Sequence, residues 1–325
     1  MRTRLLLSAL AAVVATWAFS LGASAAAPAT DGPSASAKIF RPVGAPQRLA
    51  VAANSAANLN YNGGHVLTSP GILLIFWGPT WSSGFSSGGF TNVQAENYIS
   101  SFAGGVGGSS WLNSTTQYCQ GVATGTQFCP AGAQHPVNAA GQLKGTWIDT
   151  TSIPAHPSDS QVRAAARRGA AHFGYNANAL YMVLTSHGHS IRGFGTQFCA
   201  YHDNTTFNGL PLAYANDPYA PDAGRSCGLN FVNGSNNSFG NGFFDGYSIT
   251  TGHEYAEAIS DALPSQRLAW VDSQGAENGD KCAWGRGPGP QSASTNISLG
   301  GRSFAVQSLW SNLANGGAGG CVISS

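Results

Sequence analysis

Short apolar runs alternate along this chain with segments in which apolar residues recur at helical spacing. Continuous runs of strand length predict strands, and capped segments of helical period predict helices. The predicted strands are residues 71–78, 146–149, 179–185 and 304–306. The predicted helices are residues 92–103, 158–173 and 247–263, the last ended by Pro264.

Strand, helix and strand in this order predict a βαβ-like core. We therefore expect an α/β (α+β) fold in a single secreted domain, with a central sheet, flanking helices and disulfide-stapled loops. The stretch from Cys199 to Asp245 is expected to be loop-rich, because it shows no sustained period.

The first 60 residues look different from the rest. Arg2 and Arg4 precede an apolar run that ends at the small residues 23–25, which is typical of a secretory signal peptide. Residues 26–60 are rich in Ala, Pro and Ser, and we expect a flexible lead or a pro-segment there. The predicted organisation is therefore a signal peptide at 1–25, this lead at 26–60 and one domain at 61–325.

Charge is scarce: charged residues make up 9% of the chain and the formal net charge is +1. Nucleic-acid binding needs a basic patch, so nucleic acid is not an expected partner. No segment after the signal peptide is long and apolar enough for a membrane anchor. We expect a secreted, extracellular monomer that meets an extracellular peptide or a cell-wall polymer.

Six cysteines in an exported chain favour disulfides, and six thiols allow 15 pairings. Short loops favour two local pairs and leave the last two cysteines for each other. The expected bridges are Cys119–Cys129, Cys199–Cys227 and Cys282–Cys321.

Acidic residues gather around one histidine. The chain has four glutamates, and two of them, Glu254 and Glu257, follow His253 in one predicted helix. Positions i and i+4 share a helix face, so His253 and Glu257 can reach one ion. The pattern resembles the H-E-x-x-H helix of zinc peptidases, with Glu257 in place of the second histidine.

This resemblance implies a zincin-like active helix. His253 and Glu257 would bind one divalent metal and Glu254 would be the general base. A third ligand must come from elsewhere: Glu277 is the first choice, and Asp261 and Asp280 are competitors. Zinc is favoured, but two carboxylates make a hard site that also admits calcium or manganese.

Other readings of these residues stay open. The two helix glutamates also suit solvated positions, and His253 also suits a hydrogen-bonded core position. His187 and His189 follow a predicted strand, and His202 lies in the predicted loop region, so each is a lesser metal-ligand candidate.

Several segments together resemble the phosphate-induced protein 1, or EXORDIUM-like, family of secreted proteins. The matching pieces are Tyr61-Asn62-Gly63-Gly64, Val66-Leu67-Thr68, Ile75-Phe76-Trp77-Gly78, Ala179 to Ser186 with Phe198-Cys199, and Leu309-Trp310 with Cys321. The resemblance implies an extracellular, growth-related protein and supplies no catalytic mechanism.

Two functions follow as hypotheses. The first is a secreted metal-dependent hydrolase, in particular a zincin-like peptidase. The alternative is a non-catalytic extracellular protein of the EXORDIUM-like type that binds cell wall or carbohydrate. The alternative draws on tryptophans that would form a sugar-stacking surface: Trp77, Trp81, Trp111, Trp270 and Trp284.

Overall fold

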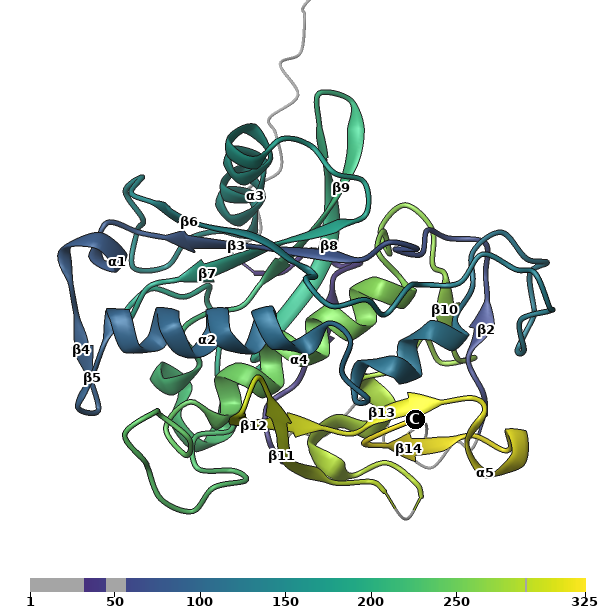
Figure 1. The fold of residues 1–325 in the computed structure, drawn as a ribbon. Coiled ribbons are helices and arrows are strands. Elements are labelled where there is room, and N and C mark those ends of the chain that lie inside the picture. The colour runs from purple at the N-terminus through teal and green to yellow at the C-terminus, as the bar shows by residue number, and fades with distance from the viewer. Residues whose placement is uncertain (1–31, 45–56, 290) are drawn as a thin grey trace, which may run out of the picture.

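A six-stranded mixed sheet lies at the centre of the computed structural model, which describes residues 32–44, 57–289 and 291–325 (Figure 1). The fold is mixed α/β, as the sequence predicted. The predicted signal peptide lies outside the described residues. The sheet order is β1 (Lys38–Phe40), β8 (Ala200–Phe207), β9 (Leu210–Asn216), β7 (Ala179–Thr185), β3 (Gly71–Trp77) and β6 (Leu143–Asp149).

Strands β6, β3, β7 and β9 are parallel, while β8 and β1 add to one edge in antiparallel pairs. The predicted strands 71–78 and 179–185 are β3 and β7, and both are buried along their whole length. Side chains alternate between the two faces of a strand, so Leu74 and Phe76 pack on one side of the sheet and Ile75 and Trp77 on the other. Burial on both faces explains why these strands are continuous apolar runs.

Helices cover both faces of the sheet. Figure 1 shows α3 (Asp159–Phe173) on one face and α2 (Asn92–Val106) and α4 (Asp245–Ser260) on the other. Helix α2 is capped by the Thr91 hydroxyl, which accepts from the Gln94 backbone N–H, and not by Asn92 as predicted. The cause is the capping box that Thr91 forms with Gln94.

Helix α4 is buried along its whole length. Every residue from Asp245 to Ser260 is buried, because the helix lies between the sheet, α2 and the β12 strand. It begins two residues before the predicted start and ends three before the predicted end, with Asp261 as its C-cap. A helix buried on all sides needs a reason for each polar residue it carries.

The loop-rich prediction for residues 199–245 is wrong over its first part. Residues 200–216 form the β8–β9 hairpin, which places His202 on a sheet strand. Asn208 and Gly209 form its turn with φ of 50° and 80°. The Asn-Gly pair is a strong hairpin signal, but the polar residues of β8 hide the alternation that identifies a strand.

The expected flexible lead is also partly wrong. Residues 38–40 form β1 and pair with His202, Tyr201 and Ala200 of β8. Phe40 is fully buried, and this burial fixes a segment whose composition suggested disorder. Removal of the segment as a pro-segment stays a prediction.

The remaining elements surround the far side of α4 and the ends of the sheet. The described residues form all three predicted disulfides. No helix among them is long and apolar enough to cross a membrane. The short helices are α1 (Thr80–Ser83), α5 (Ala314–Gly317) and the 3-10 segments η1 (Leu112–Gln117), η2 (Ala220–Cys227) and η3 (Asp280–Gly285). The paired strands are β4 (Ser86–Ser87) with β5 (Phe90–Thr91), β2 (Asn60–Tyr61) with β10 (Trp270–Val271), β11 (Ser294–Leu299) with β12 (Arg302–Gln307), and β13 (Leu309–Ser311) with β14 (Gly320–Val322).

Candidate metal centre

A buried cluster of two histidines and several carboxylates lies where α4, β8 and the loop before η3 meet. The side chains of His202, His253, Glu254, Glu257 and Glu277 are fully buried within it. Nearby Asp280, at the start of η3, is one fifth exposed. The cluster contains two groups whose ligand atoms lie within 4.8 Å of one another.

The first of these, the His253 group, consists of His253, Glu257 and Asp280. His253 Nε2 lies 3.1 Å from Glu257 Oε1 and 4.0 Å from Asp280 Oδ1. The backbone N–H of Asp280 donates to the same Glu257 oxygen at 2.8 Å. The structure thus brings together the predicted pair with Asp280, which the sequence ranked as a competitor.

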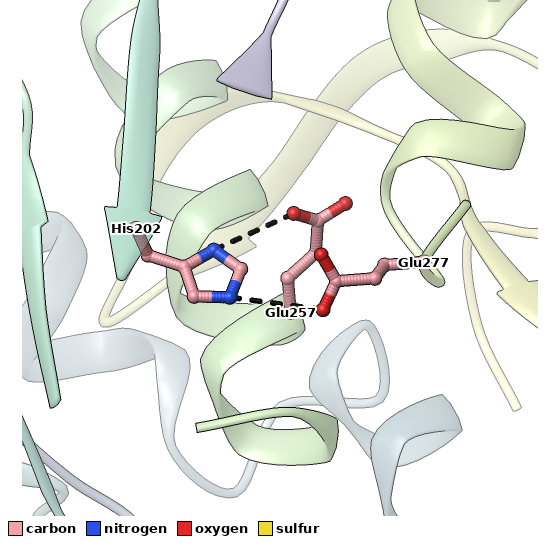
Figure 2. A group of neighbouring side chains, drawn as sticks. All are labelled: His202, Glu257 and Glu277. Atoms are coloured by element: carbon pink, nitrogen blue, oxygen red, sulfur yellow. Dashed lines mark ion pairs between the residues drawn. The ribbon is translucent and has the colours of Figure 1, made fainter. Parts of the chain in front are cut away.

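The second, the His202 group, consists of His202, Glu257 and Glu277 (Figure 2). His202 Nδ1 lies 3.6 Å from Glu257 Oε2, and His202 Nε2 lies 3.6 Å from Glu277 Oε1. Glu254 adjoins this group, with its Oε2 at 3.1 Å from His202 Nδ1. Glu277 therefore meets Glu257 beside His202, whereas the sequence placed it beside His253.

Gln307 of β12 sets the tautomer of His253. Its amide nitrogen donates to the carbonyls of Gly279 and Ser308, so its oxygen faces His253 Nδ1 at 3.3 Å. An oxygen acceptor at this distance places the ring proton on Nδ1. His253 Nε2 is then unprotonated and has no hydrogen-bond partner among the described residues, although Glu257 Oε1 lies 3.1 Å away.

A backbone carbonyl sets the tautomer of His202 in the same way. His202 Nε2 lies 3.1 Å from the Asp261 carbonyl oxygen, which only accepts, so Nε2 carries the proton. The lone pair of Nδ1 then faces the carboxylates of Glu254 and Glu257. Each histidine therefore has an unprotonated ring nitrogen 3.1 Å from a carboxyl oxygen, Glu254 Oε2 for His202 and Glu257 Oε1 for His253.

Several buried oxygens in the cluster have no hydrogen-bond partner among the described residues. They belong to Glu254, Glu257, Asp261 and Glu277, and His253 Nε2 shares their state. A buried polar atom without a partner costs roughly 1–3 kcal/mol, and more when it is charged. Protons on the carboxyls or cations between the facing groups would reduce this cost.

Burial shifts the pKa of both histidines and of Glu254, Glu257 and Glu277 toward the neutral form. It lowers the pKa of His202 to about 3, helped by Lys38, and that of His253 to about 4 against the opposing charge of Asp280. Both rings are therefore neutral at pH 7. Burial, followed by the charges of neighbouring carboxylates, raises the pKa of Glu254 and of Glu257.

Strand β1 covers the cluster from the side of the sheet edge. The Lys38 ammonium lies 3.8 Å from Glu277 Oε2 and donates to the Gly275 carbonyl at 3.0 Å. The Phe40 ring stacks on the His253 ring, with centroids 3.8 Å apart. The predicted lead thus supplies a cation and an aromatic lid to the site.

The loop that carries Glu277 and Asp280 is tied to the rest of the chain. The Cys282–Cys321 bridge joins η3 to β14, and Asn278 donates to the Ala256 carbonyl of α4. Gly279 fits between these anchors because a Cβ there would lie 2.7 Å from His253 Nδ1.

Other predicted residues lie apart from the cluster or in a different role. His187 pairs with Asp222 at 2.5 Å, and His189 lies 3.0 Å from the Pro154 carbonyl. Asp261 uses one carboxylate oxygen to accept from the Ala269 N–H. The prediction of a sugar-stacking surface is wrong, because all five tryptophans that would form it are buried.

His202 is the candidate-site residue whose position the sequence predicts wrongly. The sequence predicts a loop there and makes His202 only a lesser metal-ligand candidate, whereas the structure places it on β8 within the cluster. The Asn208-Gly209 turn signal identifies the hairpin, and with β8 recognised, its buried polar residues would have drawn attention.

Comparison with known protein families, curated proteins and solved structures finds no match for this chain. The EXORDIUM-like resemblance therefore stays a prediction, and the function must be argued from the site.

Proposed function

We propose that this chain is a secreted metalloprotein whose buried cluster binds a divalent cation, and that it is a zincin-like hydrolase when the site is open. The observation that carries the proposal is the contact of 3.1 Å between His253 Nε2 and Glu257 Oε1. Both atoms are buried, His253 Nε2 has no hydrogen-bond partner among the described residues, and a cation bound by both would supply one.

The spacing of the donor atoms suits a small divalent ion. Zinc binds imidazole nitrogen and carboxylate oxygen at about 2.0–2.2 Å, so neighbouring ligands in a tetrahedral site lie roughly 3.3–3.6 Å apart. The distance of 3.1 Å between His253 and Glu257 is slightly shorter than this and that of 4.0 Å between His253 and Asp280 slightly longer, so both carboxylates need a small movement. Zinc is the favoured ion, and the carboxylate-rich donor set also suits manganese or calcium.

His253 has the support that metal-binding histidines need. Gln307 accepts from its second nitrogen, which fixes the ring and makes the first nitrogen a better donor to metal. A bound ion would polarise a carbonyl and lower the pKa of a water molecule. Glu254 would accept that proton, since its Oε1 is buried and has no hydrogen-bond partner among the described residues.

Hydrolysis requires that the cluster be opened, because a catalytic ion keeps one position for substrate or water. Lys38 and Phe40 lie over the site in the described form. In our proposal residues 26–60 are a pro-segment, and their removal after secretion uncovers His253 and Glu277. The three disulfides are compatible with an extracellular protein.

Elemental analysis of purified protein, combined with a peptide-library assay, tests the proposal. We expect stoichiometric metal, cleavage activity in the processed protein, and a loss of about 10²–10⁴ in rate for Glu254→Gln with metal retained. Glu96→Gln is the control, because Glu96 lies on α2 and is hydrogen-bonded to Asn92. Protein that contains no metal and gains no thermal stability from zinc, manganese or calcium would refute the metal proposal.

The same experiment separates the alternative function. Stoichiometric metal without hydrolysis of any library peptide, in protein that lacks residues 26–60, would favour a structural ion in a non-catalytic extracellular binding protein. Equal loss of metal and activity in Glu254→Gln would make Glu254 a ligand instead of the base.

A further inference from the structure

We infer that the cluster is a dinuclear centre, in which Glu257 bridges two divalent ions. One ion belongs to the His253 group and the other to the His202 group, which share this one carboxylate. The inference rests on the metal site proposed above and extends it, because the sequence predicted a single ion.

The two oxygens of Glu257 face different histidines. Oε1 lies 3.1 Å from His253 Nε2, and Oε2 lies 3.6 Å from His202 Nδ1. A carboxylate that presents one oxygen to each of two donor sets is the usual bridging ligand of two-metal sites, whose ions lie about 3.5–4 Å apart. Each group then offers one imidazole, and Asp280 adds a carboxylate to the first group. Glu277 of the second group lies 3.6 Å from the protonated Nε2 of His202.

The tautomers leave one nitrogen of each histidine free to bind a cation. The proton of His253 is on the nitrogen that faces Gln307, and the proton of His202 is on the nitrogen that faces the Asp261 carbonyl. The unprotonated nitrogen of each ring therefore lies near Glu257, at 3.1 Å from Oε1 for His253 and at 3.6 Å from Oε2 for His202. Two cations bound there would also give a partner to Oε2 of Glu257, which has none among the described residues.

The cluster holds enough carboxylates for two divalent ions. Five carboxylates gather here, and Lys38 is the cation that the described residues bring closest to them. The five are Glu254, Glu257, Asp261, Glu277 and Asp280.

A second ion changes the chemistry that the site offers. Two adjacent ions can stabilise both the attacking and the leaving oxygen of a hydrolytic reaction. Glu254, at 3.1 Å from His202 Nδ1, then lies beside the second ion. The dinuclear centre would thus offer the chemistry of two-metal hydrolases.

Metal stoichiometry of the full-length chain tests the inference without any activity assay. The protein is stripped with a chelator, reloaded with Mn²⁺ and dialysed, and its metal content is measured with its electron paramagnetic resonance spectrum. We expect two ions per chain and the spectrum of a spin-coupled pair, whereas a single site gives one ion and an isolated Mn²⁺ spectrum. One ion per wild-type chain would overturn the inference but leave the proposed function standing.

Variants assign the two ions. We expect one ion per chain in His202→Gln and one in His253→Gln, and none in Glu257→Gln. His187→Gln is the matched control, since His187 is partly exposed and pairs with Asp222 outside the cluster, and it should keep two ions. Two ions retained in His202→Gln would overturn the assignment. No metal in folded wild-type protein would mean that protons hold the contacts, and both the inference and the proposed function would fail.

Discussion

The substitution Lys38→Met tests how the charge of Lys38 affects both the stability of the metal-free protein and the binding of metal. The ammonium lies 3.8 Å from Glu277 Oε2, and the side chain is 13% exposed. Methionine keeps much of the length and apolar contact of lysine but removes the charge. We expect opposite effects in the two forms of the protein: lower stability without metal and tighter metal binding.

The size of both effects follows from the geometry. A pair of unit charges at this distance interacts by about 4 kcal/mol at an effective dielectric constant near 20, and breaking a buried pair costs roughly 3–5 kcal/mol. At roughly 2–4 °C per kcal/mol, the metal-free protein should melt about 10 °C lower. A divalent ion about 6 Å from the ammonium is repelled by about 1.4 kcal/mol even at the dielectric constant of water, so its affinity should rise at least tenfold in Lys38→Met.

The assay is a thermal melt of chelator-treated protein, followed by a zinc titration of wild type and variant at pH 7.5. Lys144→Met is the control, because Lys144 is exposed and donates to the Gly141 carbonyl far from the cluster in sequence. It should change neither measurement. Weaker or unchanged zinc binding in Lys38→Met would refute the reasoning that the Lys38 ammonium repels the bound ions.

Two further predictions test the surroundings of the cluster. Gly279→Ala should weaken metal binding at least tenfold, because its Cβ would lie 2.7 Å from His253 Nδ1, whereas Gly234→Ala, which meets nothing within 4 Å, should have no effect in the same titration. Burial raises the pKa of Asp217 to about 7 against two threonine hydroxyls, so its stabilising contribution is present below about pH 4 and lost as the pH rises to about 7. Asp217→Asn should therefore raise the free energy of unfolding by up to about 4 kcal/mol more at pH 8 than at pH 4 in urea melts, and an equal change at both pH values would contradict this.

The parallel core of the sheet could be predicted because its strands are buried on both faces. Such strands must be apolar at every position, and β3 and β7 stand out in the sequence for that reason. Strand β8 was not predicted, because His202 and Asp203 are polar and polar residues suggest a solvent-exposed loop. In the structure both side chains are buried. Strand β1 has three residues, and its order depends on pairing with β8, a contact that composition does not reveal.

Half of the candidate site was visible from spacing along one helix. His253 and Glu257 are four residues apart, and the helix period alone puts them on one face. The partners of each depend on tertiary contacts: Asp280 reaches His253, and Glu277 reaches His202 from the same loop. Sequence spacing could not divide these two acids between two histidines, because the division is made by the turn at Gly279 and by the position of β8.

The enclosure of the cluster also explains why a chain so poor in charge keeps these acids in its core. Buried carboxylates without partners would destabilise the fold by several kcal/mol, and Oε2 of Glu257 has no hydrogen-bond partner among the described residues, while its Oε1 accepts from the Asp280 N–H. Lys38 offsets one charge from the predicted pro-segment, which ties closure of the site to the presence of that segment. If the segment leaves, its charge must be replaced, and divalent ions are the partners that the histidine lone pairs can also bind. Metal affinity should therefore rise when residues 26–60 are removed.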